Sequence, residues 1–276
     1  MMQFIDTHTH LDGEEFGPDR EEVMDRARKA GAKALFLPAI DLASSRNILS
    51  LCQQYPGFLF PMVGLHPEEV RADYQDVLAA MALLLSSNSG KDGGSSSQDE
   101  AGGILPIAIG EVGLDFYWSR EFEQEQLASF EEQVRWSVET RLPLMIHCRK
   151  AQNELVHILK RYRDNLPGGV FHCFTGNEKE AAELLDFDRF VLGIGGVLTF
   201  KKSKLPETLA AAVPLNRIVL ETDSPYMAPV PMRGQRNESS YIPYIIHRLA
   251  EVYHVSEEEI AEQTTCTAEH IFDIKI

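Results

Sequence analysis

The sequence predicts an α/β fold, a (β/α)8 TIM barrel with an extra C-terminal helix, because eight short apolar runs alternate with longer amphipathic stretches. Strands that alternate with helices pair in parallel through right-handed crossovers. The chain has 276 residues, of which 44% are hydrophobic. This is enough for one large core, and a single barrel often has this length. We therefore expect one domain that spans residues 1–276.

The expected strands are short runs rich in apolar and β-branched residues. They are Phe4–His8, Ala34–Pro38, Phe60–Leu65, Pro106–Glu111, Leu144–His147, Val170–His172, Phe190–Ile194 and Ile218–Glu221. The helical patterns between them include Arg20–Ala30, Gln124–Thr140 and Gln152–Arg163. Two more helical patterns follow the eighth strand and should cover the outer wall of the barrel. The last one opens at Ser256, with Glu259 three residues later, as in a capping box.

One stretch, Ser86–Gly103, interrupts this alternation. It reads SSNSGKDGGSSSQDEAGG and is too polar and too rich in glycine to bury a core. We interpret it as a flexible surface insertion at about residues 86–103. The alternative is a linker between two domains. The strand pattern resumes at Ile104, however, and the chain before the stretch has too few strands for a separate core.

The charge balance restricts the class of partner. The chain has 42 acidic and 26 basic side chains, a formal net charge of −16. This charge repels polyanions and disfavours a long groove that tracks phosphates, so local cations must hold any nucleic acid. The four cysteines form no CxxC pair, and the N-terminus lacks the pattern of a signal peptide, so we expect a cytoplasmic protein. We expect no membrane contact and no stable protein partner.

Five of the nine histidines lie at or just beyond the ends of expected strands, and two carboxylates share this position. These residues are His8, His10, His66, His147, His172, Glu111 and Asp223. In a TIM barrel the carboxyl ends of the strands and the loops after them build the active site. We therefore expect these side chains to converge.

The alternation of side chains along a strand refines this expectation. His8 and His10 should face the same way. Arg149, two residues beyond His147, should point into the mouth of the barrel, and Glu221, two residues before Asp223, should lie one layer deeper. The same rule turns Cys148 and Cys173 toward the helices as packing residues.

A lone histidine at the end of a strand is more often a hydrogen-bonded structural residue than a ligand. Four histidines and two acids gathered at one rim are different, because several ionisable groups would then lose solvent without a compensating cation. The set therefore predicts a site for divalent metal. Mixed imidazole and carboxylate ligands suit zinc, manganese, cobalt or nickel better than calcium.

Seven motifs carry a resemblance to a known family. They read FIDTHTHLD, VGLHP, AIGEVGLDFY, MIHCRKA, FHCFTGN, VLETDSPY and RGQRNE. In this order and spacing the chain resembles, over nearly its whole length, the TatD family of metal-dependent deoxyribonucleases, which are amidohydrolase-like barrels. The resemblance implies a TIM barrel, a pair of divalent metal ions and hydrolysis of DNA phosphodiester bonds, often from a 3′ end. Met232 and Ser239 depart from the family pattern, which has histidine and proline there.

The resemblance also implies the ligand sets. His8, His10, Glu111 and Asp223 are expected around one ion, and Glu111, His147 and His172 around the other. Glu111 would bridge, since a carboxylate has two oxygens that can span two ions. The ions would be zinc, manganese or magnesium, and magnesium is included because family members use it.

The expected reaction is attack of a metal-activated hydroxide on phosphorus. Asp223 would bind metal and also accept a proton, and His66 would contact phosphate or protonate the leaving group. The alternative for His66 is a structural residue before Pro67. Arg149 offers a planar fork suited to phosphate.

Further contacts to the substrate are expected from the loop PVPMRGQRNE, which contains Arg233 and Arg236. Arg233 is a candidate to bind phosphate, whereas Arg236 is equally well explained by pairing with a nearby acid such as Glu238. Tyr117 and Trp118 could stack a nucleobase or pack against their own loop.

The leading hypothesis is a nuclease, a 3′–5′ exonuclease that trims single-stranded or frayed DNA ends, with a role in DNA repair. An amidohydrolase-like enzyme that acts on a small ester, amide or phosphoester is the alternative. A barrel that only binds metal and a partner is a third hypothesis, but a set of residues that activates water has no evident use in binding alone.

Overall fold

The computed structural model describes residues 2–85 and 104–276, in which eight strands form one sheet in the order of the sequence. The pairs β1–β2, β3–β4, β4–β5, β5–β6 and β7–β8 are parallel. The last strand also meets the first, since the Thr7 amide donates to the Leu220 carbonyl at 2.9 Å and Thr9 bridges Ser224 in parallel. This order confirms the predicted (β/α)8 class. The predicted insertion at 86–103 lies outside the described residues.

The predicted strands are confirmed with small shifts at their ends. The observed strands are β1 (Phe4–Asp6), β2 (Ala32–Pro38), β3 (Leu59–Val63), β4 (Ala108–Asp115), β5 (Leu144–Arg149), β6 (Gly169–Phe171), β7 (Phe190–Ile194) and β8 (Ile218–Leu220). The largest difference is in β4, which we expected to end at Glu111. It continues for four residues beside β5, after a register shift between Ile109 and Val112.

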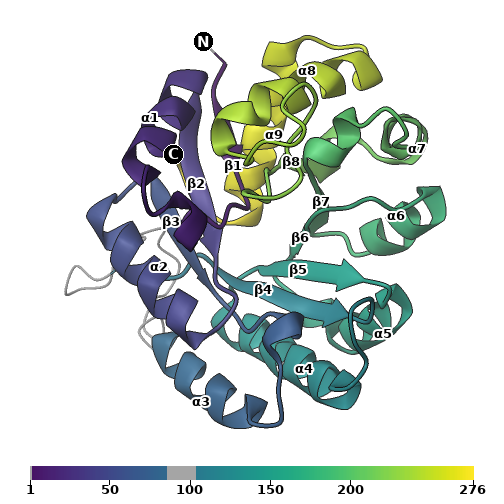
Figure 1. The fold of residues 1–276 in the computed structure, drawn as a ribbon. Helices are drawn as coiled ribbons and strands as arrows, with labels where there is room; N and C mark the ends of the chain where they lie inside the picture. The colour runs from purple at the N-terminus through teal and green to yellow at the C-terminus, as the bar shows by residue number, and fades with distance from the viewer. Residues whose placement is uncertain (1, 86–103) are drawn as a thin grey trace. The chain divides into compact units, whose positions relative to one another are not determined.

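A helix follows every strand, and one more helix ends the described chain (Figure 1). The helices are α1 (Arg20–Ala30), α2 (Leu42–Gln54), α3 (Tyr74–Leu85), α4 (Glu123–Thr140), α5 (Gln152–Tyr162), α6 (Glu178–Leu185), α7 (Leu205–Ala212), α8 (Ile242–Tyr253) and α9 (Glu257–Ile271). The predicted bounds of α1 are confirmed at both ends. The helix stops at Gly31, whose φ of 112° is left-handed and suits glycine. At the start of α9 the Glu259 amide donates to Ser256 Oγ at 3.1 Å, one half of the predicted capping box.

The contacts within the chain divide it into two compact units. Unit 1 comprises Met1–Leu37, His172–Ile271 and Ile276, and unit 2 comprises Pro38–Phe171 and Phe272–Lys275. The prediction of a single domain stays a prediction.

In unit 1 the last helix covers strands, as expected, and the helix before it packs on the last one. Helix α9 packs on β1 and β8, and α8 packs on α9. Ile246 and Leu249 of α8 and Ile260 of α9 are fully buried between these elements. The apolar faces of both helices therefore belong to the core of this unit.

Ion pairs join α1 to the loop that follows β8. Arg26 binds both carboxylate oxygens of Glu238, with Nε 2.8 Å from Oε1 and Nη2 2.6 Å from Oε2. Arg236 binds both oxygens of Asp19, at 2.8 and 2.7 Å. Arg236 is thus engaged within the fold, although its partner is not the sequence neighbour Glu238.

In unit 2 two glutamines of α4 hold the ends of strands. Gln126 and Gln133 lie seven residues apart on the buried face of the helix. Gln133 accepts from the Leu65 amide at 2.7 Å and donates to the Leu65 carbonyl at 3.1 Å, and Gln126 accepts from the Asp115 amide at 3.0 Å. The segments that carry His66 and Asp115 are therefore tied to a helix by side chains.

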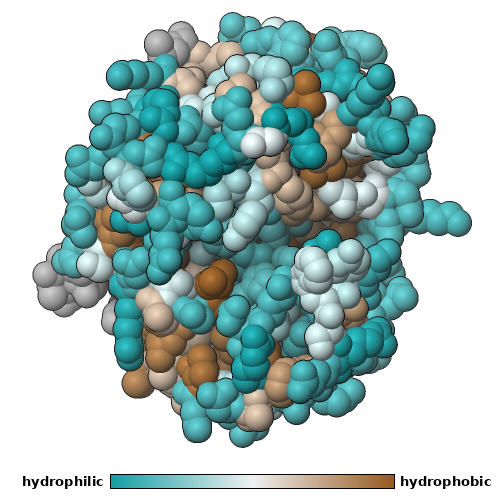
Figure 2. Space-filling view, viewed as in Figure 1, coloured by the Kyte–Doolittle hydropathy of each residue, from teal (hydrophilic) through white to brown (hydrophobic). Residues whose placement is uncertain are grey.

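In the described part of the chain no helix is both long enough and apolar enough to cross a membrane. The face in Figure 2 carries mostly hydrophilic side chains, with small apolar areas between them. Among the described residues, none of the cysteines forms a disulfide; they are Cys52, Cys148, Cys173 and Cys266.

The Arg26–Glu238 pair predicts a dependence of stability on pH. Burial would raise the pKa of Glu238, but hydrogen bonds from Arg26 and Ser240 outweigh burial and lower it. A lowered folded-state pKa stabilises the fold above the unfolded-state value, about 4.3 for glutamate, and this stabilisation is lost as the pH falls through the folded-state pKa. Since the Arg26 side chain is 43% exposed, we expect Glu238→Gln to lower the free energy of unfolding by only about 1–2 kcal/mol at neutral pH.

Urea unfolding of the parent and the variant between neutral and acidic pH tests this expectation. The difference between the two proteins should shrink below the usual pKa of glutamate. Glu139→Gln, at an exposed position of α4, is the control and should unfold like the parent throughout. A constant difference at every pH would contradict the role of the ion pair.

Candidate metal centre

The first cluster lies in unit 1 and consists of His8, His10, His172, Glu221 and Asp223. The two imidazoles of the HxH motif face the same way, as predicted, with their Nε2 atoms 3.3 Å apart. Asp223 Oδ1 lies 3.7 Å from Nε2 of His8 and 3.5 Å from Nε2 of His10. His8 is fully buried, whereas 17% of the His10 side chain is exposed. This edge of the cluster is therefore open to solvent on the side of His10.

Backbone bonds hold this edge beyond the formal ends of β1 and β8. The Asp223 amide donates to the His8 carbonyl, and the His10 amide donates to the Ser224 carbonyl, both at 2.9 Å. These backbone hydrogen bonds continue the pairing of the two segments past the ends of the strands. They therefore hold the side chains of His8, His10 and Asp223 next to one another.

Asp6 supports the same segments from beneath. Its carboxylate accepts hydrogen bonds from the Thr222 amide at 2.9 Å, the Thr222 hydroxyl at 2.7 Å and the Ser239 hydroxyl at 2.6 Å. Burial raises the pKa of Asp6 to about 6, despite these bonds. Ser239 is one of the two departures from the family pattern, and its hydroxyl gives Asp6 a donor that proline lacks.

His172 and Glu221 complete the first cluster. The ring of His172 stacks on that of His8, with centroids 4.0 Å apart and planes 11° apart, and its Nδ1 lies 3.9 Å from Glu221 Oε1. The Cys173 amide donates to Oε1 of Glu221, but no described residue donates a hydrogen bond to its buried Oε2. Burial raises the pKa of Glu221 to about 8.

The space for Glu221 comes from a glycine on the neighbouring strand. A Cβ atom at Gly193 of β7 would lie 2.1 Å from Glu221 Oε2, so no other residue fits there without displacing the carboxylate. Glu221 is fully buried, as the alternation predicts. A carboxylate oxygen of Glu221 also lies close enough to ring nitrogens of His8 and His172 for these three side chains to hold one cation. Glu221 is therefore a candidate metal ligand, although it was expected only to support the site from the layer below.

The second cluster lies in unit 2 and consists of His66, Glu111, Asp115 and His147. His147 lies between two carboxylates, with Nδ1 3.0 Å from Glu111 Oε1 and Nε2 2.9 Å from Asp115 Oδ2. Burial would lower the pKa of His147, but the hydrogen bonds and charges of Asp115 and Glu111 outweigh it and raise the pKa to about 9. Without metal, the His147 ring is therefore protonated on both nitrogens, and positively charged, at neutral pH.

His66 lies beside the same glutamate. Its Nδ1 accepts from the Glu68 amide at 3.1 Å, so the proton of the neutral ring is on Nε2, which lies 3.2 Å from Glu111 Oε1. His66, Glu111 and His147 could hold one cation between them. The predicted contact of His66 with phosphate stays a prediction, and its position makes it a candidate ligand too.

Asp115 is the residue that the sequence analysis missed. It lies at the end of β4 because that strand continues past Glu111. Gly113 makes this continuation feasible, since its φ is +141° and a Cβ atom there would lie 1.9 Å from the His147 carbonyl oxygen. The signal was present in AIGEVGLD, where the second acid follows the first by four residues and shares its face in an extended strand.

The predicted phosphate-binding arginines lie in different surroundings. Arg149, at the exposed end of β5, stacks on Tyr117, with its guanidinium carbon 3.9 Å from the ring centroid. Arg233 is exposed in the loop after β8 and stacks on Phe200 at 3.9 Å. Both keep cationic groups at the surface, and their contact with phosphate stays a prediction.

Cys173 does not follow the alternation on which its expected orientation rests. Its φ of 50° takes it out of the strand, which ends at Phe171. Its sulfur lies 3.8 Å from Met227 Sδ, in the loop after β8.

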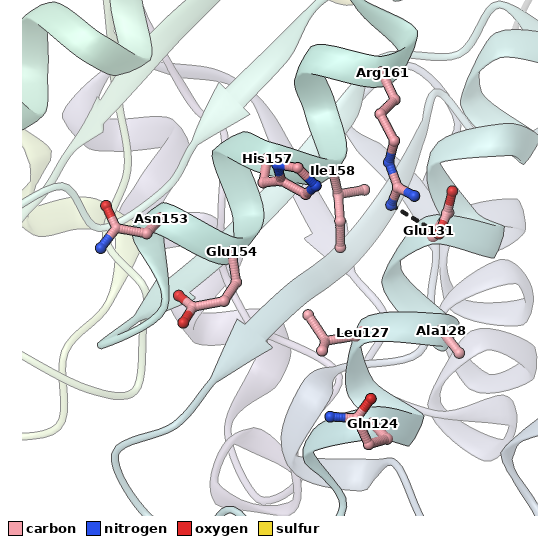
Figure 3. Close-up of a pocket in the computed structure, with 9 residues that line it drawn as sticks. All are labelled: Gln124, Leu127, Ala128, Glu131, Asn153, Glu154, His157, Ile158 and Arg161. Carbon is pink, nitrogen blue, oxygen red and sulfur yellow. Dashed lines mark ion pairs between the residues drawn. The ribbon is translucent and has the colours of Figure 1, made fainter.

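A groove between α4 and α5 on unit 2 has a different character. Leu127 and Ile158 line it together with an ion pair in which Arg161 Nη2 lies 2.8 Å from Glu131 Oε2 (Figure 3). None of the described residues that line it is a predicted metal ligand. The candidate metal ligands lie in the two clusters instead.

The donor set fits a divalent cation. In each unit two imidazoles and one carboxylate offer atoms within 4.8 Å of one another: His8, His172 and Glu221 in unit 1, and His66, Glu111 and His147 in unit 2. The buried Glu221 oxygen that lacks a described donor is the kind of atom that a cation satisfies. Imidazole with carboxylate suits zinc or manganese.

Comparison with models of known protein families shows to which family the chain belongs. The model of the TatD-related DNases matches residues 5–273. The chain belongs to this family. Members of the family are hydrolases, and the predicted resemblance is confirmed.

Individual relatives agree. A Bacillus subtilis protein described as an uncharacterized metal-dependent hydrolase, YabD, is 33% identical, and the match covers 98% of this chain and 99% of the relative. The protein named 3′–5′ ssDNA/RNA exonuclease TatD from Citrobacter rodentium is 31% identical over 99% of this chain and 98% of its own. Among solved structures, the TatD homologue YjjV from Escherichia coli has a TM-score of 0.85 and 28% identity, and covers 99% of this chain and 98% of that chain.

The second cluster predicts that Asp115→Asn weakens metal binding without unfolding the chain. The amide removes the negative charge from Nε2 of His147, so the pKa of the ring should fall from about 9, and the ring loses an anionic partner that orients it. Loss of such a partner typically lowers metal affinity by about 10- to 100-fold.

Competition between the protein and a chelator for zinc or manganese measures this loss. Asp164→Asn, at an exposed position after α5, is the control and should bind metal like the parent. Unchanged affinity of the Asp115 variant would contradict the role of the carboxylate.

Proposed function

We propose that the protein is a divalent-metal-dependent nuclease that hydrolyses DNA phosphodiester bonds, as a 3′–5′ exonuclease on single-stranded or frayed ends. The observation that carries this proposal is that each unit gathers two imidazoles and a carboxylate within 4.8 Å. Membership of the TatD-related DNases and the name of the Citrobacter rodentium relative support the reaction class.

We further propose that the two clusters serve one site with two ions of zinc, manganese or magnesium. His8, His10, Glu111 and Asp223 would hold one ion, and Glu111, His147 and His172 the other. The (β/α)8 topology supports a common site, because the carboxyl ends of all strands lie at one end of such a barrel. Bound ions of this kind lower the pKa of water and stabilise the charge that develops on phosphate.

The protein's own groups would handle the protons. Burial would raise the pKa of Asp223, but its hydrogen bond with His10 and the neighbouring His8 and His172 lower it. Asp223 is therefore ionised at neutral pH, and its Oδ atoms can accept a proton from water. His66 is proposed to donate a hydrogen bond from Nε2–H to phosphate or, when its ring is doubly protonated, to protonate the leaving oxygen. Glu221 would hold the first cluster from the deeper layer.

Three side chains are proposed to bind the phosphates of the substrate: Arg149, His66 and Arg233. The two arginines offer local cationic contacts, and His66 offers an N–H donor, on a chain of net charge −16. A DNA substrate, a cytoplasmic location, a role in DNA repair and the lack of a stable protein partner belong to the same proposal.

The direct test is incubation of the metal-loaded protein with short single-stranded DNA and RNA labelled at either end, beside small ester, amide and phosphoester substrates. Shortening from the 3′ end, abolished by a chelator, supports the proposal. Hydrolysis of the small substrates alone would replace the nuclease with an amidohydrolase-like enzyme.

Glu111→Gln tests the bridging carboxylate. The amide keeps the shape of the side chain but loses the charge that two ions would share, and it also removes the anion next to His147 and His66. We expect the variant to lose one bound ion per chain and to keep its circular dichroism spectrum. Its kcat/KM should fall by more than about 100-fold, the upper cost of removing a residue that only hydrogen-bonds a metal ligand. Elemental analysis counts the ions, and Glu139→Gln is the control. Full activity with both ions retained would exclude the bridge.

The dependence of binding on salt tests whether phosphate contacts are local. With two to four contacts, the logarithm of affinity for single-stranded DNA should fall with the logarithm of salt concentration at a slope of about −1.4 to −2.8, because each contact contributes about −0.7. Fluorescence anisotropy of a labelled oligonucleotide gives the slope. A slope of about −6 or steeper, typical of a long basic groove, would be incompatible with the proposal.

A further inference from the structure

Two exposed aromatic rings follow β4 in unit 2. Tyr117 is 50% exposed and Trp118 is 64% exposed, whereas most large apolar side chains of the described chain are buried. The rings meet edge to face, with centroids 4.8 Å apart and planes at 82°. They therefore pack on each other and leave aromatic surface open to solvent.

A cation lies against the same pair. The guanidinium carbon of Arg149 is 3.9 Å from the centroid of Tyr117 and 5.1 Å from that of Trp118. The backbone joins the two segments as well, since the Phe116 amide donates to the Arg149 carbonyl at 2.9 Å. Arginine on aromatic rings holds its charge in a fixed place and leaves its N–H groups directed outward for other acceptors.

Asp115 fixes this surface relative to the second cluster. One carboxylate oxygen, Oδ1, accepts from the Tyr117 amide at 2.8 Å and lies 3.4 Å from the Trp118 amide nitrogen. The other oxygen, Oδ2, lies 2.9 Å from Nε2 of His147. A single side chain thus holds both the aromatic turn and a histidine of the candidate metal centre.

We propose that Tyr117, Trp118 and Arg149 form a stacking platform that binds an unpaired nucleobase next to the phosphate to be cleaved. The base would stack on Trp118, and Arg149 would contact the adjoining phosphate. The inference rests on the proposed nuclease function and specifies its substrate as single-stranded. A base within a duplex offers no free face to the ring, whereas every unpaired base does. The charge of the platform also suits the substrate. The chain as a whole is acidic and repels a polyanion, whereas Arg149 places a positive charge at this point of the surface.

The sequence offers a direct probe of this platform. It has two tryptophans, and the other one, Trp136, is 7% exposed in α4. Trp136→Phe leaves Trp118 as the single reporter. The metal-loaded variant is titrated with short oligothymidylate whose phosphorothioate linkages slow hydrolysis, and tryptophan fluorescence is recorded. We expect quenching by this oligomer and by its RNA counterpart, since both carry bases, and none by an abasic oligomer of equal charge or by a blunt duplex. Quenching by the abasic oligomer to the same degree would overturn base stacking.

Substitutions in the otherwise unchanged protein give a second, independent readout. Trp118→Ala should lower affinity for the oligothymidylate by about 5- to 150-fold, the range for one stacked base, and leave affinity for the abasic oligomer unchanged. Trp118→Phe should restore most of the affinity. Leu83→Ala, at a 72% exposed position of α3, is the matched control and should bind like the parent.

The two proposals fail differently. If the phosphorothioate oligomer quenches Trp118 but the unmodified oligomer of the same sequence is never shortened by the metal-loaded parent, the platform is supported and the nuclease is refuted. Oligomers that are shortened by Trp118→Ala as efficiently as by the parent, with unchanged KM, would overturn the platform and leave the nuclease in place.

Discussion

Buried carboxylates need a proton or a positive charge near them, and this constraint organises the candidate metal centre. Burial raises the pKa of Glu221 to about 8, and two carboxylates raise that of His147 to about 9. Protons meet this need in the absence of metal. A divalent ion meets it better, since it binds the carboxylate and the neutral imidazole and releases the protons. Burial of these candidate ligands thus favours a bound divalent ion.

The scaffold serves this constraint through residues that carry no reactive group. Gly193 leaves the volume that the Glu221 carboxylate fills, and Gly113 lets β4 run close to the His147 carbonyl. In unit 1, Ser239 donates to the buried Asp6 beneath the HxH segment. In unit 2, Gln126 and Gln133 bind backbone groups beside Asp115 and His66. Substitution of these residues would move ligands without removing any.

Regular patterns made the barrel and the convergence of the candidate ligands at strand ends predictable from the sequence, whereas irregular backbone hid the rest. Alternation along strands gave the shared face of His8 and His10 and the burial of Glu221. It failed at Cys173, whose left-handed φ breaks the alternation, and it missed Asp115, because the register shift between Ile109 and Val112 that precedes the end of β4 is not visible in an apolar pattern. Arg236 pairs with Asp19 across more than two hundred residues, and no local signal identifies such a partner.

The central claim is that the two clusters together hold a pair of ions bridged by Glu111. Anomalous diffraction from crystals of the manganese- or zinc-loaded protein, measured at the absorption edge of the metal, tests it most directly. The account predicts two peaks about 3.5–4 Å apart, with one Glu111 oxygen at each ion, His8 and His10 at one ion and His147 at the other. A single peak, or ions too far apart for one carboxylate to span, would contradict it.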